Sequence, residues 1–195
     1  MDYLVYNLAD LPADTAELPL LPPDEQLQAT QRGGHYAAIR SLLRRELERR
    51  SGIPAQEIVF AYTQHGKPEF PPQPFNLSHS GDCLCLAFHH QAIGVDVEQM
   101  RPRRNLAALA TRMMCPEQSE AFCSRDCPLE EFYACWCAAE AIVKLAGDTM
   151  WNARSYPFLY NNGRIRCLFD PAPSVTLFTP MPGYMGAVAF HSPMS

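Results

Sequence analysis

The 195-residue sequence predicts an α+β fold in which a set of helices is followed by a small antiparallel sheet, twice along the chain. Two long segments have the apolar spacing of amphipathic helices, and each is followed by short strands separated by turn-forming residues. Hydrophobic residues make up 47% of the chain and charged residues 19%, which is typical of an ordered protein with a sizeable core. No internal sequence repeat is visible, so we expect the halves to resemble each other in architecture only.

The first half is expected to begin with a strand and one long helix. Residues 2–8 alternate in polarity as a strand does, and the proline-rich segment 11–23 is expected to be a loop. Asp24 is a suitable N-cap for a helix that runs to about Arg50, and Gly52 is placed to end it. This helix is therefore predicted as one continuous element.

A small sheet is expected to follow this helix. Short apolar runs predict strands near 57–63, 83–89 and 93–98. Two turn-rich segments separate these strands, Gly66-Lys67-Pro68 and Ser78-His79-Ser80-Gly81.

The second half repeats the order of helices and sheet. The apolar spacing predicts helices near 105–123 and 128–147. Four strands are expected after them, near 156–160, 164–169, 174–179 and 185–191. The dipeptide Asn162-Gly163 predicts a tight hairpin between the first two of these strands.

Charge, apolar runs and cysteine spacing exclude several classes of function. The net charge of −5 gives no overall reason to bind nucleic acid. The segment Met1–Asn7 lacks the features of a signal peptide, and no stretch approaches the ~18 apolar residues of a membrane span. We therefore expect a cytoplasmic protein without a membrane partner. The eight cysteines lack paired C-x-x-C spacing, so they are expected to be reduced core thiols.

Acidic side chains on two predicted elements suggest a site for a hard cation. In Ile93-Gly94-Val95-Asp96-Val97-Glu98, the two carboxylates share one face of a strand while Val95 and Val97 face the core. Such a pair suits Mg²⁺ better than zinc. On the helix predicted near 128–147, Trp136, Glu140 and Lys144 share one face at a spacing of four residues. The alternatives are a polar strand edge for the first pair and a solvated helix ion pair for Glu140 and Lys144.

A third element has groups that suit a phosphate. The segment Phe75-Asn76-Leu77-Ser78-His79-Ser80-Gly81 is predicted to run from a strand end into a turn. A turn of this kind offers backbone N–H groups, hydroxyls and an imidazole to an anion. The sequence has no Walker, Rossmann or G-x-S-x-G motif that would indicate another enzyme class.

These pieces, in this order, resemble the 4'-phosphopantetheinyl transferase superfamily in its larger, monomeric, surfactin-synthetase-activating class. The resemblance covers about Arg32 to Phe190. Four segments match successive motifs of that family: Gly66-Lys67-Pro68, Phe75–Ser80, Ile93–Glu98 with Arg101-Pro102, and Phe132–Lys144. The resemblance implies two α+β halves related by a pseudo-twofold axis, residues 1–100 and 101–195, with coenzyme A and Mg²⁺ bound in the cleft between them.

The resemblance also implies roles for particular residues. A monomeric enzyme is expected to transfer the phosphopantetheine arm of coenzyme A to a serine of an apo acyl or peptidyl carrier protein. The implied metal ligands are Asp96, Glu98 and Glu140. Glu140 is the candidate base, directly or through a metal-bound water, and Lys144 is placed against the pyrophosphate. The residues implied to hold the nucleotide, and its 3'-phosphate in particular, are Arg32, Arg40, Lys67, Ser78 and His79. Arg44 is a further candidate, although Arg44, Arg45, Arg49 and Arg50 are expected to form a solvated helix face.

One departure from the family pattern leaves alternatives open. Where the family usually has Lys-Glu-Ala or Lys-Glu-Ser, this chain has Ala139-Glu140-Ala141. If Ala139 faces the pyrophosphate, a cation is missing there and the chain is a degenerate relative that binds coenzyme A or a carrier without efficient transfer. If Ala139 belongs to the apolar stripe, the departure lies in the core. A Mg²⁺-dependent phosphohydrolase using the same carboxylates is a third hypothesis.

A carrier protein would need a landing site on this acidic chain. Carrier proteins of the implied kind are acidic around the acceptor serine, so basic side chains are expected in the docking surface. The candidates are Arg101, Arg103 and Arg104, with Met113 and Met114 on the following helix. The alternative for the two methionines is a place in the core.

Overall fold

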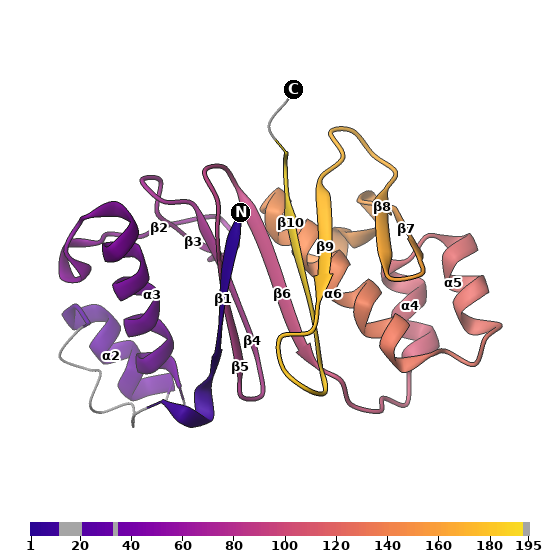
Figure 1. The fold of residues 1–195 in the computed structure, drawn as a ribbon, viewed down its shortest axis with the longest axis horizontal. Helices are drawn as coiled ribbons and strands as arrows, with labels where there is room; N and C mark the ends of the chain where they lie inside the picture. The colour runs from indigo at the N-terminus through magenta and orange to yellow at the C-terminus, as the bar shows by residue number, and fades with distance from the viewer. Residues whose placement is uncertain (12–20, 33–34, 193–195) are drawn as a thin grey trace.

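The structure, a computed structural model, describes residues 1–11, 21–32 and 35–192, and in them two three-stranded antiparallel sheets lie side by side (Figure 1). The first sheet has the order β1 (Asp2–Asn7), β5 (Cys83–Phe88), β4 (Phe75–Ser80). The second has the order β6 (Ile93–Gln99), β10 (Tyr184–Phe190), β9 (Ser174–Phe178). Two smaller ladders pair β2 (Ala61–Tyr62) with β3 (Pro68–Glu69), and β7 (Phe158–Asn161) with β8 (Arg164–Cys167). The expectation of an α+β chain with small antiparallel sheets is confirmed.

Helices accompany each sheet. The α-helices are α2 (Pro23–Arg32), α3 (Tyr36–Ser51), α4 (Leu106–Met113), α5 (Pro116–Cys123) and α6 (Leu129–Ala146). Short 3₁₀ helices are η1 (Leu8–Asp10), η3 (Ala55–Glu57) and η4 (Met150–Ser155). Within the described residues, no helix is long and apolar enough to cross a membrane.

Both helical regions that were predicted as continuous are divided. The helix expected from Asp24 to Arg50 is α2 and α3, and Asp24 lies inside α2 instead of capping it. Residues 33–34, two glycines, separate the two and lie outside the described residues, as do 12–20 of the expected loop. The helix expected near 105–123 is α4 and α5, because Pro116 at the start of α5 lacks the N–H that a continuing helix needs.

Other boundaries follow local backbone chemistry. Gly52 ends α3 with a φ of 74°, and its N–H donates to the Glu48 carbonyl. The Asn162-Gly163 hairpin is confirmed, with φ of 46° and 76° at the two residues. The strand expected near 57–63 is only β2, since residues 55–57 form η3.

The core consists of helix-on-sheet layers with a third apolar cluster between the sheets. Leu43 and Leu47 of α3 pack on the first sheet, and α6 packs on β6 and β10 of the second. The third cluster contains Val95 and Val97 of β6 together with Cys83 and Cys85 of β5. Val95 and Val97 therefore face the core as predicted.

The cysteines are only partly core residues. All eight are free thiols, and those on β5 and α6 are buried: Cys83, Cys85, Cys135 and Cys137. The expectation of core thiols is wrong for Cys123, which is exposed at the end of α5.

The edge strands β4 and β6 lie next to each other, and hydrogen bonds between β4 side chains and β6 fix their relative position. We call this contact the seam. Asn76 Oδ1 accepts from the Val95 N–H at 2.8 Å, and Ser80 Oγ accepts from the Gln99 N–H at 3.2 Å. The side chains of Asn76, Ser78 and Ser80 on β4 each contact β6 18 or 19 positions later in the chain, so the two strands run in the same direction. The first and second sheets are thereby aligned with each other at this seam.

Gly94 lets the second sheet and α6 approach closely. A Cβ on Gly94 would lie 1.9 Å from the Ala141 carbonyl oxygen and 2.6 Å from the Leu145 nitrogen. No side chain fits in that space. The glycine thus sets the short separation between the strand that carries Asp96 and the helix that carries Glu140.

Candidate active site

One cleft of about 1000 Å³ is lined by residues from both parts of the chain. Its walls come from α2, α3, the turn between β2 and β3, β4, and the end of α6 with the residues that follow it. Predicted site residues that line it are Arg32, Arg40, Lys67, His79, Glu140 and Lys144. The other predicted residues, Ser78, Asp96 and Glu98, lie on the β4–β6 seam next to Lys144 and Glu140.

Arginines of α2 and α3 form part of a cationic wall. The Arg32 guanidinium lies 5.1 Å from the centre of the Tyr36 ring. Arg40 is only 8% exposed, and its Nη2 donates to the Tyr62 hydroxyl at 3.0 Å. Burial would lower the pKa of Arg40, but its hydrogen bond to Tyr36 and the charge of Glu25 raise that pKa above its usual value. Arg40 is therefore a fixed cation.

Lys67 and His79 extend this wall toward α6. Lys67 Nζ donates to the backbone carbonyl of Lys144 at 2.7 Å, in the last turn of α6, where a cation also complements the helix dipole. Burial lowers the pKa of Lys67, and the charge of Lys144 lowers it further. Burial lowers the pKa of His79, and its interactions with Lys144 and His35 lower it further. A bound phosphate would oppose both shifts.

Asp96 and Glu98 share one face, as predicted, and each accepts from a serine across the seam. Asp96 Oδ1 lies 2.7 Å from Lys144 Nζ and 2.8 Å from Ser78 Oγ. Glu98 Oε2 accepts from Ser80 Oγ at 2.9 Å. Asp96 is 4% exposed, and its Oδ2 is buried without a hydrogen-bond partner in the described part of the chain.

Glu140 lies on α6 within the field of both seam carboxylates. Burial raises its pKa to about 7, Lys144 opposes the shift, and the charges of Asp96 and Glu98 add to it. A carboxyl group with a pKa near neutrality can take up a proton at physiological pH.

Two observations suggest that these residues could hold a metal ion: the local negative charge, and one carboxylate oxygen that has no hydrogen-bond partner. Among the described residues, no three His, Cys, Asp or Glu side chains are gathered as a metal-binding group. Asp96 Oδ2 is nonetheless a buried oxygen that lacks a partner, and Glu140 has a raised pKa beside two further carboxylates. Hard oxygen donors and a local excess of negative charge both suit a divalent cation of the magnesium type.

The predicted anion-binding turn is wrong. Ser78, His79 and Ser80 belong to β4, and this strand pairs with β5 along its whole length. The backbone of these residues therefore takes part in the β4–β5 ladder and does not form a turn. Ser78 donates to Asp96 at 2.8 Å, which places its hydroxyl on a carboxylate. The turn itself begins at Gly81, with a φ of 53°.

Arg44 and Glu25 form a buried pair that the sequence interpretation missed. Arg44 is 3% exposed, so the expectation of a solvated face is wrong for this residue. Its Nε lies 2.8 Å from Oε2 of Glu25, which is itself 1% exposed. No local sequence signal identifies Glu25, because its partners lie on another helix. The cleft histidines His35 and His65 were also missed, since they carry no motif.

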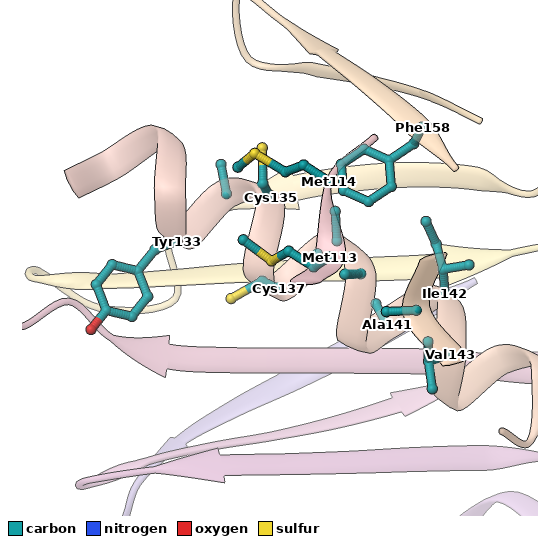
Figure 2. Close-up of a cluster of buried hydrophobic side chains, with 14 of the residues drawn as sticks. Met113, Met114, Tyr133, Cys135, Cys137, Ala141, Ile142, Val143 and Phe158 are labelled. Carbon is teal, nitrogen blue, oxygen red and sulfur yellow. The ribbon is translucent and has the colours of Figure 1, made fainter. Parts of the chain in front are cut away.

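Ala139, Met113 and Met114 belong to the core. Ala139 is 3% exposed within the cluster around α6, so the interpretation as part of the apolar stripe is the correct one. Met113 and Met114 are each 1% exposed, and Figure 2 shows both inside this cluster beside Cys135 and Phe158. The methionines are therefore excluded from the predicted docking surface, which leaves the exposed arginines Arg101, Arg103 and Arg104.

Comparison with known proteins finds one family. The family model described as the 4'-phosphopantetheinyl transferase superfamily matches residues 92–183. The 4'-phosphopantetheinyl transferase AcpT of Escherichia coli (strain K12) is 37% identical over 150 residues, covering 73% of this chain and 73% of that protein. The transferase HetI of a Nostoc species is 33% identical over 124 residues, 58% of this chain and 52% of HetI. The transferase psf-1 of Bacillus pumilus is 31% identical over 111 residues, 54% of this chain and 47% of psf-1.

Proposed function

The chain belongs to the 4'-phosphopantetheinyl transferase superfamily, and on that premise we propose that it transfers the 4'-phosphopantetheine arm of coenzyme A to a serine of an apo acyl or peptidyl carrier protein. The product released would be 3',5'-ADP. The observation that carries the proposal is a single cleft with cations on one wall and Glu140 and Lys144 on the other. A substrate with a nucleotide phosphate at one end and a reacting pyrophosphate at the other matches that division.

We propose that residues 1–100 and 101–195 are two halves related by a pseudo-twofold axis. The first sheet and the helices on it lie within residues 1–100, whereas the second sheet takes β9 and β10 from residues 101–195 and β6 from the end of the first range. A layer of helix on a three-stranded antiparallel sheet thus occurs twice, which supports this relation. The seam between β4 and β6 is where the two sheets meet, and β6 ends just before the boundary at residue 100. Because one chain supplies both walls of the cleft, we propose that the enzyme acts as a monomer.

The cationic wall would hold the nucleotide and its 3'-phosphate. It is lined by Arg32 of α2, Arg40 of α3, Lys67 of the β2–β3 turn and His79 of β4. Guanidinium groups match phosphate oxygens in pairs, and the imidazole of His79 would gain a proton as a phosphate approached. Ser78 was expected on this wall, but its contact with Asp96 supports a role in holding that carboxylate.

Asp96, Glu98 and Glu140 would hold Mg²⁺, with Ser78 and Ser80 orienting the first two carboxylates. The ion, when bound, would neutralise charge on the pyrophosphate and polarise its oxygens. Lys144, whose Nζ lies 2.7 Å from Asp96 Oδ1, would add a cation for the same pyrophosphate.

Glu140 is the group best suited to activate the acceptor serine. In the proposed reaction the serine oxygen bonds to the β-phosphorus of coenzyme A, and the bond from that phosphorus to the 3',5'-ADP oxygen breaks. Glu140 would take the serine proton as the general base. Lys144 offsets the charge that develops on the leaving phosphate.

The proposal is tested by incubating the protein with an apo carrier protein, coenzyme A and Mg²⁺ and measuring the mass of the carrier. A mass gain equal to one phosphopantetheine group is expected. Binding of coenzyme A without a gain would indicate a degenerate relative. Breakdown of coenzyme A without labelling of the carrier would indicate a phosphohydrolase. Either of the last two results would overturn the proposed function.

A further inference from the structure

Glu25 stands at the centre of a buried network behind the cationic wall. It lies in the first turn of α2 and is 1% exposed. Its Oε2 lies 2.8 Å from Arg44 Nε, and its Oε1 lies 3.4 Å from Arg40 Nε. One carboxylate thus binds two arginines that are one turn apart on α3, and it joins α2 to α3 at that point.

The two arginines use their remaining donors differently. Arg44 Nη1 donates to the carbonyls of Ala55 at 2.7 Å and Ile58 at 2.9 Å, so this side chain fixes the chain segment that leads to β2. Arg40 Nη2 donates to the Tyr62 hydroxyl at 3.0 Å. Arg40 Nη1 makes no hydrogen bond to any described residue, and Arg40 lines the cleft. Arg44 therefore has a structural role, while Arg40 retains a donor for a ligand.

Aromatic rings hold both guanidinium groups in place. The Phe60 ring centre lies 5.0 Å from the Arg40 guanidinium carbon and 4.9 Å from that of Arg44. The Tyr36 ring centre lies 5.7 Å from the Arg40 guanidinium carbon. With a carboxylate at one edge and rings on its faces, Arg40 has little freedom to turn away from the cleft.

We propose that Glu25 is a positioning residue for phosphate binding: it holds the Arg40 guanidinium so that Nη1 faces the cleft and receives a phosphate of the nucleotide. This inference rests on the proposed function, and it deepens that function by assigning a residue remote from the ligand. The direction of the expected change in anion affinity distinguishes positioning from a simple effect of charge. If Glu25 acted only through its charge, removing that charge would raise the positive potential of the cleft and tighten anion binding. Loss of a positioned donor has the opposite effect.

The test measures the dissociation constant of 3',5'-ADP by titration calorimetry for the wild type and for Glu25→Gln. We expect the variant to bind about tenfold more weakly, the effect of losing a charge-assisted contact. The KM for coenzyme A should rise with it, while the KM for the carrier should not change. The control is Glu46→Gln, which removes an α3 carboxylate that pairs with Arg49 at 2.8 Å and does not line the cleft.

Two further variants keep the test decisive. Glu25→Asp preserves the charge but withdraws the carboxylate by one methylene, so weaker binding by this variant supports positioning even if Glu25→Gln does not fold. In an Arg40→Met background, Glu25→Gln should produce no further loss of affinity, because its effect passes through Arg40. Unchanged or tighter binding in folded Glu25 variants would overturn the inference and leave the proposed function standing. Failure of the wild type to bind 3',5'-ADP would overturn both.

Discussion

The two walls of the cleft differ in how far the protein itself satisfies their charges. On the cationic wall, Arg40 contacts Glu25, Tyr36 and Tyr62, and Lys67 binds a carbonyl at the end of α6. On the opposite side, the three carboxylates of Asp96, Glu98 and Glu140 have Lys144 as their nearby cation. Arg103 lies 4.0 Å from Glu98. Burial and mutual repulsion there raise the pKa of Glu140 to about 7.

This difference indicates how each wall would meet a ligand. The cationic wall has donors whose positions are set before an anion arrives, so binding there costs little reorganisation. The negative charge of the carboxylates is only partly offset by neighbouring cations, so this wall favours binding of a positively charged group. A substrate that brings a metal ion to one side and a phosphate to the other would satisfy both walls at once.

The largest expected effect is on the carboxylate side. Replacing Glu140 by glutamine keeps the shape of the side chain and removes its ability to accept a proton. We expect transfer to fall by about 10²- to 10⁴-fold, the range for a general base. The rate is measured by mass spectrometry of the carrier at saturating coenzyme A and Mg²⁺.

A matched control for this change is Glu120→Gln on α5, which alters an exposed glutamate outside the cleft. It should leave the transfer rate near that of the wild type. Circular dichroism verifies that Glu140→Gln is folded. If the folded variant transferred at nearly the wild-type rate, Glu140 would not be the base, and the difference between the walls would not reflect catalysis.

A second change asks whether a cation at position 139 could relieve the carboxylates. Ala139 is buried in the α6 cluster, so Ala139→Lys places an ammonium in an apolar core. We expect a loss of at least about 2 kcal/mol in the free energy of unfolding from overpacking and charge burial, with no gain in kcat. Urea unfolding and the transfer assay check the two parts. A stable variant with a lower KM for coenzyme A would show that the position reaches the pyrophosphate.

The outer edge of the carboxylate side offers a pair of neighbouring arginines for comparison. Arg103 lies 4.0 Å from Glu98 and stacks near Trp136, whereas no ion pair links Arg104 to a described residue. We expect Arg104→Glu to raise the KM for an acidic carrier about tenfold through lost electrostatic attraction and to leave the KM for coenzyme A unchanged. Arg103→Glu should raise both constants. Equal changes in both constants for Arg104→Glu would argue against docking at this loop.

The last expected effect is a pH dependence of stability without metal. The folded state raises the pKa of Glu140 from its usual 4.5 to about 7, so the proton is held more tightly in the folded chain. Its stabilising contribution is therefore complete below pH 4.5 and is lost as the pH rises through 7. The difference in unfolding free energy between wild type and Glu140→Gln should fall across that window in EDTA. A difference that stayed flat with pH would contradict the charge imbalance, and Mg²⁺ should reduce the fall.

Elements whose signals are local could be predicted from the sequence. Three such signals depend only on neighbouring residues: the apolar stripe of α6, the apolar runs of β5 and β6, and the Asn162-Gly163 turn. The structure contains each of the elements that they predict. The carboxylate pair on β6 followed from strand periodicity alone. Gly94 had a readable signal as well, because a glycine inside an apolar strand often marks a close approach.

Features that depend on distant partners could not be predicted in the same way. Glu25 is an ordinary polar position of a short helix until α3 brings Arg40 and Arg44 to it. Ser78 and Ser80 have turn-forming side chains, but pairing with β5 extends the strand through them. Arg44 could not be distinguished from the solvated arginines near it, because its carbonyl acceptors lie in the segment after the helix.

The pairing of β6 has a consequence for the order of events during synthesis. Its antiparallel partner in the sheet is β10, in which Ala187 lies opposite Asp96 and Met185 opposite Glu98. The first sheet needs only β1, β4 and β5, so it can be complete when the ribosome has added residue 88 and the exit tunnel has been cleared. The strand with the carboxylates, β6, can pair in its sheet only after residues 184–190 have been synthesised. A nascent chain would therefore present its cationic wall well before its acidic groups are locked in register, and the activity would be among the last properties that it acquires.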